Sequence, residues 1–302
     1  LANTWFPVGT GVAGTIRAFA VSGSDLYASG SFASAGGTTA NNVARWNGTL
    51  WSALISGPTN GVGGAGYSIK AIGTVVYLTV GNTIVRWDGS TFTSLGGPTL
   101  NTLKAVHVVG SDVYAGGIGS SFGRWNGSWT TGIGGGMVTG TEGVYSIKDV
   151  GGQLYVAGRI VSAGGIGVFR IAKWDLTAGT WSPVSGGNGI GGFFAPTTLG
   201  VAGDEVYVVS DFRAVGTLGS ATIAKWDSVT GTWSPLGSGV SGSVSTVKAN
   251  GSDIYVGGTF TSAGGLAANN IAKWDSNTDT WSILGTGVNS TVTAIAVSGG
   301  FV

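Results

Sequence analysis

Residues 252–288 read SDIYVGGTFTSAGGLAANNIAKWDSNTDTWSILGTGV, and variants of this stretch recur along almost the whole chain. Each copy contains a tyrosine within an apolar run, then a basic residue before a tryptophan, a short turn and a second aromatic residue. A unit of about 46 residues repeated from end to end is typical of architectures in which neighbouring units share a core. We therefore predict a single domain over residues 1–302. The marker tryptophans are Trp46, Trp87, Trp125, Trp174, Trp226 and Trp274.

Each copy divides into four apolar runs of strand length, separated by turns rich in glycine, asparagine or aspartate. The first run is represented by TIRAFAV at residues 15–21, and the second carries the repeated tyrosine. The third ends near the marker tryptophan, and pairs such as Asn47-Gly48 then precede the fourth, which opens on the second aromatic residue. These pairs are the strongest short-range signal for a β-hairpin. Four-stranded antiparallel units in tandem predict an all-β protein, a β-propeller with one unit per blade.

Two motifs carry a resemblance to known repeats. The run Tyr255–Gly258 (YVGG), with Lys273-Trp274-Asp275 and Thr280-Trp281 after it, resembles the kelch repeat. The segments GTFTSAGG and NNIAKW are more similar still to repeats of large bacterial cell-surface and secreted proteins. The resemblance covers nearly the whole chain and implies a propeller. This sequence departs from the kelch pattern where it has a tryptophan after a cation, because kelch repeats commonly carry a tyrosine there.

The number of blades depends on the two ends of the sequence. Seven runs of the first type and seven of the fourth type occur, but only six complete runs of the third type. We expect seven blades, with Trp5 opening a strand that completes the blade begun by residues 291–297. Six blades with a terminal overhang is the alternative. An incomplete last blade has two explanations: the natural chain continues past Val302, or an open strand edge pairs with another copy or another chain.

The composition excludes several classes of function. The formal net charge is +1 and no run of lysine or arginine occurs, so we predict no binding to nucleic acid. No apolar stretch reaches the roughly 20 residues of a membrane-spanning helix, so we predict no membrane insertion. The absence of cysteine excludes disulfides and thiolate metal sites. A low content of charged residues and a start at Leu1 without a methionine indicate either a mature exported protein or an excised fragment, and we expect a location outside the cell or on its surface.

The clearest functional signal is a periodic set of cations. If the first strand is innermost, as in kelch propellers, a position near its start faces the axial channel. Five cations around one channel mouth concentrate positive potential and favour an anionic ligand such as a carboxylate, a phosphate, a sulfate or an acidic sugar. The alternative is that a repeated lysine simply lays its stem over apolar surface. Around the ring the position holds Arg17, Lys70, Lys104, Lys148, Gly200, Lys248 and Thr293.

Departures from the repeat mark a second group of residues. The connections at residues 57–66, 132–144 and 186–196 are expanded, and they carry residues outside the repeat consensus. Aromatic side chains on loops beside a channel suit a carbohydrate or a peptide. The alternative is that each aromatic packs its loop onto the blades beneath. The group consists of Tyr67, Met137, Glu142, Tyr145, Phe193 and Phe194.

Two further periodic sets have a structural explanation. The cations before the marker tryptophans, such as Arg45 and Lys273, are expected to pair with an acid on a neighbouring strand or to stack on an aromatic ring. The aspartates at repeated turn positions, such as Asp88 and Asp275, are expected to stabilise their turns. We predict no metal site from either set.

The sequence gives little support for catalysis. His107 is the only histidine, which excludes a multi-histidine metal centre, and we expect a partly buried imidazole with satisfied hydrogen bonds. No catalytic residue and no cofactor are predicted. A glycosidase needs two carboxyl groups, and Glu142 with Asp149 is the pair that the sequence leaves open.

Three functions follow. The first is a non-enzymatic extracellular module, structural, adhesive or ligand-binding, whose partner is an anionic small molecule or a glycan. The second is a polysaccharide-active lyase or hydrolase that uses the same face. The third is a rigid scaffold that self-assembles and binds no small ligand.

Overall fold

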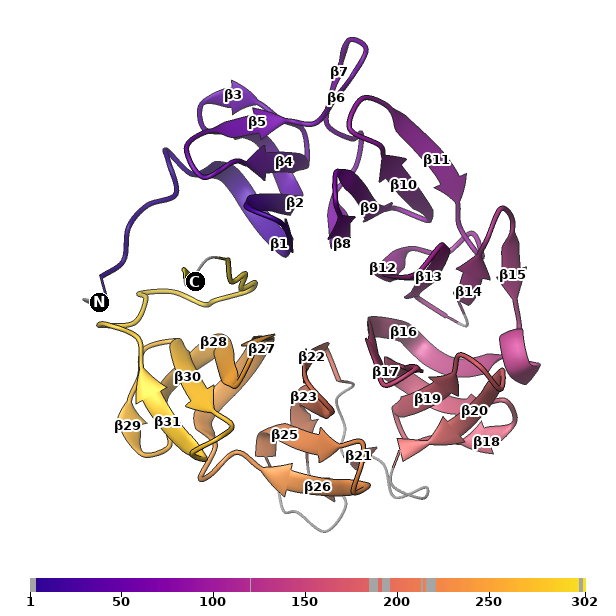
Figure 1. The fold of residues 1–302 in the computed structure, drawn as a ribbon, viewed down its shortest axis with the longest axis vertical. Coiled ribbons are helices and arrows are strands. Elements are labelled where there is room, and N and C mark those ends of the chain that lie inside the picture. The colour runs from indigo at the N-terminus through magenta and orange to yellow at the C-terminus, as the bar shows by residue number, and fades with distance from the viewer. Residues whose placement is uncertain are drawn as a thin grey trace.

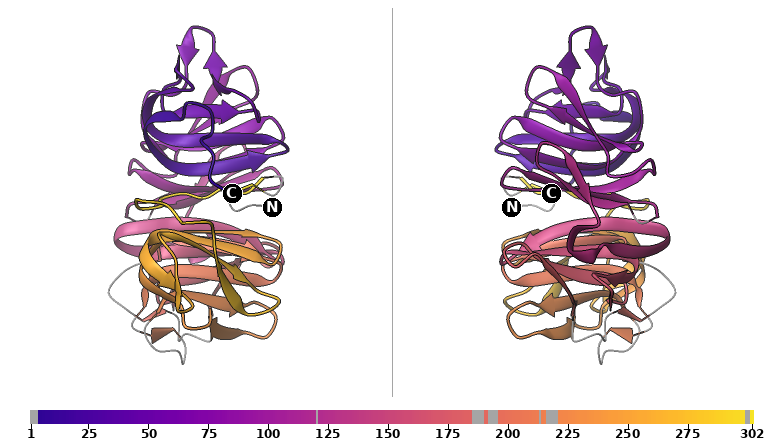
Figure 2. Two further views of the ribbon diagram at one scale, coloured as in Figure 1. Left: turned by 90° about the vertical axis from the view of Figure 1, so that its left-hand side faces the viewer. Right: turned by 90° about the vertical axis from the view of Figure 1, so that its right-hand side faces the viewer.

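The computed structural model describes residues 4–119, 121–184, 190–191, 196–212, 214–215, 221–298 and 301–302. Six sheets, each built on a path of four antiparallel strands, surround a central axis (Figure 1). Residues 4–11 and 284–298, described segments near the two ends, lie on the same side of the ring (Figure 1) and near each other in the side views (Figure 2). The predicted all-β propeller is confirmed. Within the described ranges, no helix has the length and apolar character needed to cross a membrane.

The blades follow the order of the chain, and the strand order within each blade is also sequential. Blade 1 is β1 (Val12–Ser22), β2 (Asp25–Ala35), β4 (Val43–Trp46) and β5 (Trp51–Ala53), and blade 2 is β8 (Gly66–Ile72), β9 (Val75–Val80), β10 (Thr83–Trp87) and β11 (Phe92–Gly96). Blade 3 is β12 (Leu103–Val109), β13 (Asp112–Gly117), β14 (Phe122–Trp125) and β15 (Trp129–Thr131), and blade 4 is β16 (Met137–Val150), β17 (Gln153–Ala163), β19 (Ile171–Asp175) and β20 (Thr180–Pro183). Blade 5 is β22 (Thr198–Ala202), β23 (Glu205–Phe212), β25 (Ala221–Asp227) and β26 (Thr232–Pro235), and blade 6 is β27 (Val240–Asn250), β28 (Asp253–Ala263), β30 (Ile271–Asp275) and β31 (Thr280–Ile283).

The first strand of every blade lies nearest the axis (Figure 1), so β1, β8, β12, β16, β22 and β27 form the innermost ring of strands. Core clusters lie between blades: one of them joins Tyr155 of β17 to Leu199 and Trp226 of blade 5. The Trp226 indole N–H also donates to the Tyr155 hydroxyl at 3.3 Å. The repeated tyrosines and tryptophans therefore fill the space between blades, because one face of a blade cannot be buried within that blade.

Tryptophans on the outer strands also fasten neighbouring blades through hydrogen bonds. The indole N–H of Trp129 donates to the Leu95 carbonyl at 2.7 Å, from blade 3 to blade 2. Trp281 of blade 6 donates in the same way to the Leu236 carbonyl, next to the end of blade 5, at 2.8 Å. Each of these hydrogen bonds, the buried one of Trp281 and the half-buried one of Trp129, therefore restrains the angle between its blade and the preceding one.

The prediction of a seventh blade is wrong for the described residues, and the six-blade alternative holds. Residues 291–297 join no sheet, and Trp5 lies outside any strand with 38% of its surface exposed. A first-type run forms a ladder only beside a second strand, and none is described next to it.

The two terminal segments still occupy the gap between blades 6 and 1 (Figure 1). The Val292 N–H donates to the Gly258 carbonyl of blade 6, and the Thr293 hydroxyl donates to the Ile16 carbonyl of blade 1. On the outer side, the Val8 carbonyl accepts the Trp51 indole N–H at 2.9 Å. The segments thereby connect the last blade to the first.

Part of one predicted loop is a strand. Residues 137–144, expected within an expanded connection, belong to β16, and Met137 pairs with Ala163 of β17. Met137 is buried in the core, so it belongs to no exposed patch. A small hairpin of β6 (Ile55–Ser56) and β7 (Thr59–Asn60) overlaps the start of the connection at residues 57–66.

The structural explanation of the cations on the third strands is confirmed. Arg45 lies 2.9 Å from Asp25, and Lys273 lies 2.9 Å from Asp253. The turn aspartates cap their turns: the Asp88 carboxylate accepts the backbone N–H groups of Ser90 and Thr91.

Two adjacent glycines test how tightly the outer tryptophans fit. Gly264 and Gly265 both have positive φ, and a Cβ at Gly264 would lie 2.5 Å from Trp281 Cδ1, whereas a Cβ at Gly265 would meet nothing within 4 Å. We predict that Gly265→Ala costs about 1 kcal/mol of unfolding free energy from backbone strain alone. Gly264→Ala should cost roughly 1–3 kcal/mol more because it displaces the tryptophan. Urea unfolding followed by tryptophan fluorescence measures both, and equal losses would refute the close packing.

Candidate functional site

The five predicted channel cations lie at two levels rather than in one ring. Lys70 pairs with Tyr77, Lys148 with Tyr155 and Lys248 with Tyr255, so these lysines occupy equivalent positions opposite the repeated tyrosine. Arg17 and Lys104 lie three residues before the corresponding position, which is about 10 Å along a strand. The prediction of a single ring was therefore wrong. We call the first level the lysine tier and the second the bulge tier.

The lysine tier alternates around the channel. Lys70, Lys148 and Lys248 come from blades 2, 4 and 6. The equivalent residues of blades 1, 3 and 5 are Ala20, His107 and Gly200. Among the described residues, no carboxylate forms an ion pair with any of the three lysines. This contrasts with the paired cations on the third strands.

The three ammonium groups are close enough to perturb one another. Lys148 is half-buried, and its desolvation lowers its pKa to about 8, with repulsion from Lys248 and Lys70 adding to the effect. Lys248 is exposed, but the channel wall limits the water around it and lowers its pKa, again with a contribution from Lys70. Protonation of these lysines is therefore less favourable than in water, and a bound anion would make it more favourable.

His107 and Asp149 join blades 3 and 4 beside the lysine tier. His107 is 2% exposed, and its Nε2 lies 2.5 Å from Oδ1 of Asp149, whose side chain is half exposed. Burial lowers the pKa of His107 to about 4, and Asp149 only partly counters this effect. The imidazole is thus neutral at pH 7 and donates Nε2–H to the carboxylate. The prediction of a fully satisfied histidine was wrong, because its buried Nδ1 has no partner.

The bulge tier exists because the innermost strands are irregular at one position. The pairing register shifts on either side of Arg17, Lys104 and Tyr145, and Tyr67 lies in the corresponding shift of β8. A bulged residue is left out of the ladder and its side chain is re-aimed.

The bulges also bring hydroxyl groups against the next blade. Ser68, after Tyr67, accepts the Val106 N–H, and Ser146, after Tyr145, accepts the Leu199 N–H. The irregular position is therefore fixed by contacts between blades.

Three residues of the bulge tier form a cation–aromatic cluster. Lys104 Nζ lies 3.4 Å from the centre of the Tyr67 ring, and Arg17 Cζ lies 4.4 Å from it. Contacts of this kind stabilise a cation by roughly 0.5–1 kcal/mol where the site is exposed. The hydrogen bond from Lys104, and then its charge, lower the pKa of Tyr67. The structure thus brings together three predicted site residues from blades 1, 2 and 3.

The remaining predicted residues are placed differently. Glu142 forms an ion pair with Arg159 at 3.6 Å, and burial, followed by the charge of Glu142, raises the pKa of Tyr145. Phe193 and Phe194 lie outside the described residues.

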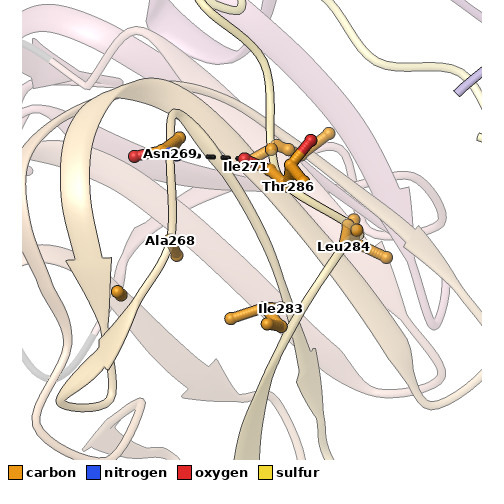
Figure 3. A pocket seen from close by; sticks show the side chains of 9 residues that line it. Ala268, Asn269, Ile271, Ile283, Leu284 and Thr286 are labelled. Carbon is orange, nitrogen blue, oxygen red and sulfur yellow. Dashed lines mark hydrogen bonds between the residues drawn. The ribbon is translucent and has the colours of Figure 1, made fainter. Parts of the chain in front are cut away.

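A separate hollow of about 240 Å³ lies in blade 6, between β29 (Leu266–Ala267) and the chain that follows β31 (Figure 3). Asn269 spans it and donates to the Thr286 carbonyl at 3.0 Å. Its lining contains no charged side chain. Since this hollow offers little beyond van der Waals contact and backbone groups, the channel is the stronger candidate.

The side chains that could bind a metal ion are few. Within the ranges that the structure describes, no group of three or more histidine, aspartate or glutamate side chains is placed to hold a metal ion.

Comparisons with known proteins agree on the fold. No protein-family model matches the sequence, and no curated protein matches it. Among solved structures, the WD40 β-propeller domain of Doa1 is similar with a TM-score of 0.67 and 14% identity, over 96% of this chain and 88% of that one. The computationally designed Ika8 protein is similar with a TM-score of 0.62 and 15% identity, over 96% and 92%. At such identities the likeness shows the fold alone.

Sequence reasoning missed His107 as a member of the tier and Asp149 as its partner. The prediction compares the first strands of the blades from their first residues. The tier position is instead the residue that pairs with the repeated tyrosine of the second strand. Alignment on that tyrosine would have placed His107, which pairs with Tyr114, beside Lys70 and Lys148.

The neutral state of His107 makes stability depend on pH. Its pKa is about 4 in the folded chain and 6.5 in the unfolded chain, so the unfolded state binds more protons between these values. We predict that the unfolding free energy falls as the pH drops from about 6.5 to 4, by about 2 kcal/mol at pH 4.5 relative to pH 7. His107→Gln should flatten the curve in that window, which is clear because the chain has one histidine. Urea titrations at each pH measure it, and a wild-type curve as flat as that of the variant would contradict it.

Proposed function

We propose that the chain is a ligand-binding β-propeller module that holds a small multivalent anion at the lysine tier of its axial channel. The observation that carries the proposal is the set Lys70, Lys148 and Lys248, at one register level on alternate blades, without a carboxylate partner in the described part of the chain. Unpaired cations in a narrow channel concentrate positive potential on its axis.

The pKa values support a ligand with more than one negative charge. A single charge would compensate one ammonium group, while the other two would still repel each other. Burial is the main reason that the pKa values of Lys148 and Lys248 are lowered, and two or three carboxylate or phosphate charges would offset both that burial and the added repulsion between the lysines. Uronic-acid oligosaccharides, dicarboxylates and phosphates share this chemistry.

We also propose that the module works outside the cell or on its surface, as a structural, adhesive or binding unit. The support is the resemblance of the repeats to those of bacterial surface and secreted proteins and the low content of charged residues. Fractionation of the producing cells, with protease treatment of intact cells, tests the location. Recovery of the protein only from the cytosol would exclude it.

The enzyme alternative gains no support from the acids that it would need. Glu142 is engaged by Arg159, and Asp149 is engaged by His107. Pairing of an open edge with another chain stays a prediction.

Removal of the lysine tier tests the anion site. We predict that the triple variant Lys70→Met, Lys148→Met and Lys248→Met binds glutarate, sulfate and a uronic-acid oligosaccharide at least 10-fold more weakly than the wild type, by isothermal titration calorimetry at low salt. Methionine keeps a long apolar stem and removes the charge that attracts the ligand.

A matched variant separates a local site from overall charge. Lys173→Met, Lys225→Met and Lys273→Met together remove the same charge from the third strands and should leave the affinity within about 3-fold, because those side chains lie outside the channel wall. Equal losses in both variants would show that only net charge matters. No measurable affinity of the wild type for any of the three anions would end the proposal.

A further inference from the structure

The segment before blade 1 lies where the outer strand of a preceding blade would lie. In blade 6 the outer tryptophan donates its indole N–H to the Leu236 carbonyl, three residues after Trp233 of β26. In blade 1 the outer tryptophan donates in the same way to the Val8 carbonyl, three residues after Trp5. Residues 5–8 therefore correspond in position to an outer strand, although they join no sheet in the described part of the chain.

The segment after blade 6 lies where the first strand of a following blade would lie. A Cβ at Gly116 of blade 3 would lie 2.7 Å from Val144 on the first strand of blade 4. A Cβ at the equivalent Gly257 of blade 6 would lie 2.5 Å from Val292. Residues 291–297 therefore take the position of a first strand, and no described strand pairs with them.

The side of blade 1 that faces these segments (Figure 1) is less covered than the same side of blade 6. Three apolar positions, one on each of the first three strands, pack against the preceding blade. In blade 6 they are at most 6% exposed, and they are Val247, Ile254 and Trp274. In blade 1 they are half-buried in a cluster whose described members all belong to that blade, and they are Phe19, Leu26 and Trp46. Trp5 is likewise 38% exposed, against 9% for Trp281 of blade 6.

We propose that residues 5–8 and 291–297 together bind a β-hairpin of another polypeptide. The hairpin supplies a second and a third strand between them, with a tyrosine on the first of its strands and a cation before a tryptophan on the other. A sheet edge with unpaired backbone groups binds an extended partner strand through main-chain hydrogen bonds. The site is separate from the lysine tier and does not depend on the anion site proposed above.

The contacts of the complete blades define what the hairpin must carry. Tyr207 of blade 5 is fully buried against blade 6, so a tyrosine at the same position covers the open side of blade 1. The rings of Trp274 and Trp281 lie 5.4 Å apart, so a tryptophan on the second hairpin strand contacts Trp5. Lys273 pairs with an acid of its own hairpin at 2.9 Å, so the cation needs no partner in this chain.

A second folded copy of this chain has no hairpin to offer among its described residues. Within each of the six blades, the second and third strands are already paired along both edges. Release of one such hairpin would break a blade and its contacts with both neighbours. The partner is therefore a different polypeptide with an unpaired hairpin of the same pattern.

The probe is a fluorescently labelled peptide with the sequence of residues 252–276, which contains β28 and β30. We expect it to bind the folded wild type, by fluorescence anisotropy, at least 10-fold more tightly than the same peptide with Trp274→Ala. At a hundredfold excess over its Kd it should raise the midpoint of thermal unfolding by about 5 °C. Hydrogen exchange measured by mass spectrometry should slow in residues 291–297 and stay unchanged in β12.

Two variants of the chain locate the site. Trp5→Ala removes the ring that the hairpin tryptophan contacts and should weaken binding at least 10-fold. Phe6→Ala is the matched control, because Phe6 is also an exposed aromatic residue, at 78%, while the equivalent position of blades 1, 4, 5 and 6 holds a serine. This control should leave the affinity within about 3-fold. Circular dichroism checks that both variants are folded.

A chimera with the hairpin sequence attached after Val302 fills the site from within the same chain and should abolish binding of the peptide. Peptide binding to the chimera, equal affinity of the wild type and Trp5→Ala, or no measurable binding to the wild type would overturn the proposal. Association of the wild type into dimers that excludes the peptide, seen by sedimentation, would also overturn it, because the occupant would then be a second copy.

Discussion

In blades 3, 4 and 6 a hydrogen bond from an outer tryptophan to the chain at the end of the preceding blade directs the packing on which the ring depends. The Trp233 indole N–H of blade 5, in contrast, has no partner among the described residues. A blade buries its faces only against its neighbours, and apolar packing alone sets no fixed angle between them. The indole N–H supplies the missing direction, because a buried donor left without an acceptor costs about 1–3 kcal/mol. Trp129 and Trp281 show the arrangement in blades 3 and 6, and Trp51 extends it to the N-terminal segment through the Val8 carbonyl.

Because hydrogen bonds of the outer strands restrain the angles between blades, the innermost strands can contain bulges. The bulge in the first strand lets Ser68 and Ser146 reach across to the next blade, and it places Tyr67 and Tyr145 out of the ladder. The same irregularity separates Arg17 and Lys104 from the lysine tier. One local deviation therefore converts a single row of cations into two levels with different neighbours.

The blade and its four strands could be predicted from the sequence, because Asn-Gly turns and the repeated aromatic residues act locally. The number of blades could not, since residues 291–297 match a first strand as well as Thr15–Val21 do and differ only in lacking a described partner strand. The cations were recognised but their levels were not, because the first strands were compared from their starts and not by their spacing to the repeated tyrosine, which separates Arg17 and Lys104 from the three lysines. The contact between His107 and Asp149 was also beyond reach, since it joins two blades.

The alternation of the lysine tier has a physical reason on each side of Lys148. A side chain at Gly200 would bring its Cβ within 3.1 Å of Val247 in blade 6, so packing opposes a lysine there. In blade 3 the place belongs to His107, which stays neutral and directs its one donor to Asp149. Lys248 and Lys70 already add repulsion to the burial that lowers the pKa of Lys148, so each additional lysine at this level would add further repulsion. Three lysines separated by uncharged residues keep an attractive potential on the axis, and their mutual repulsion adds to the desolvation that chiefly lowers the pKa of Lys148.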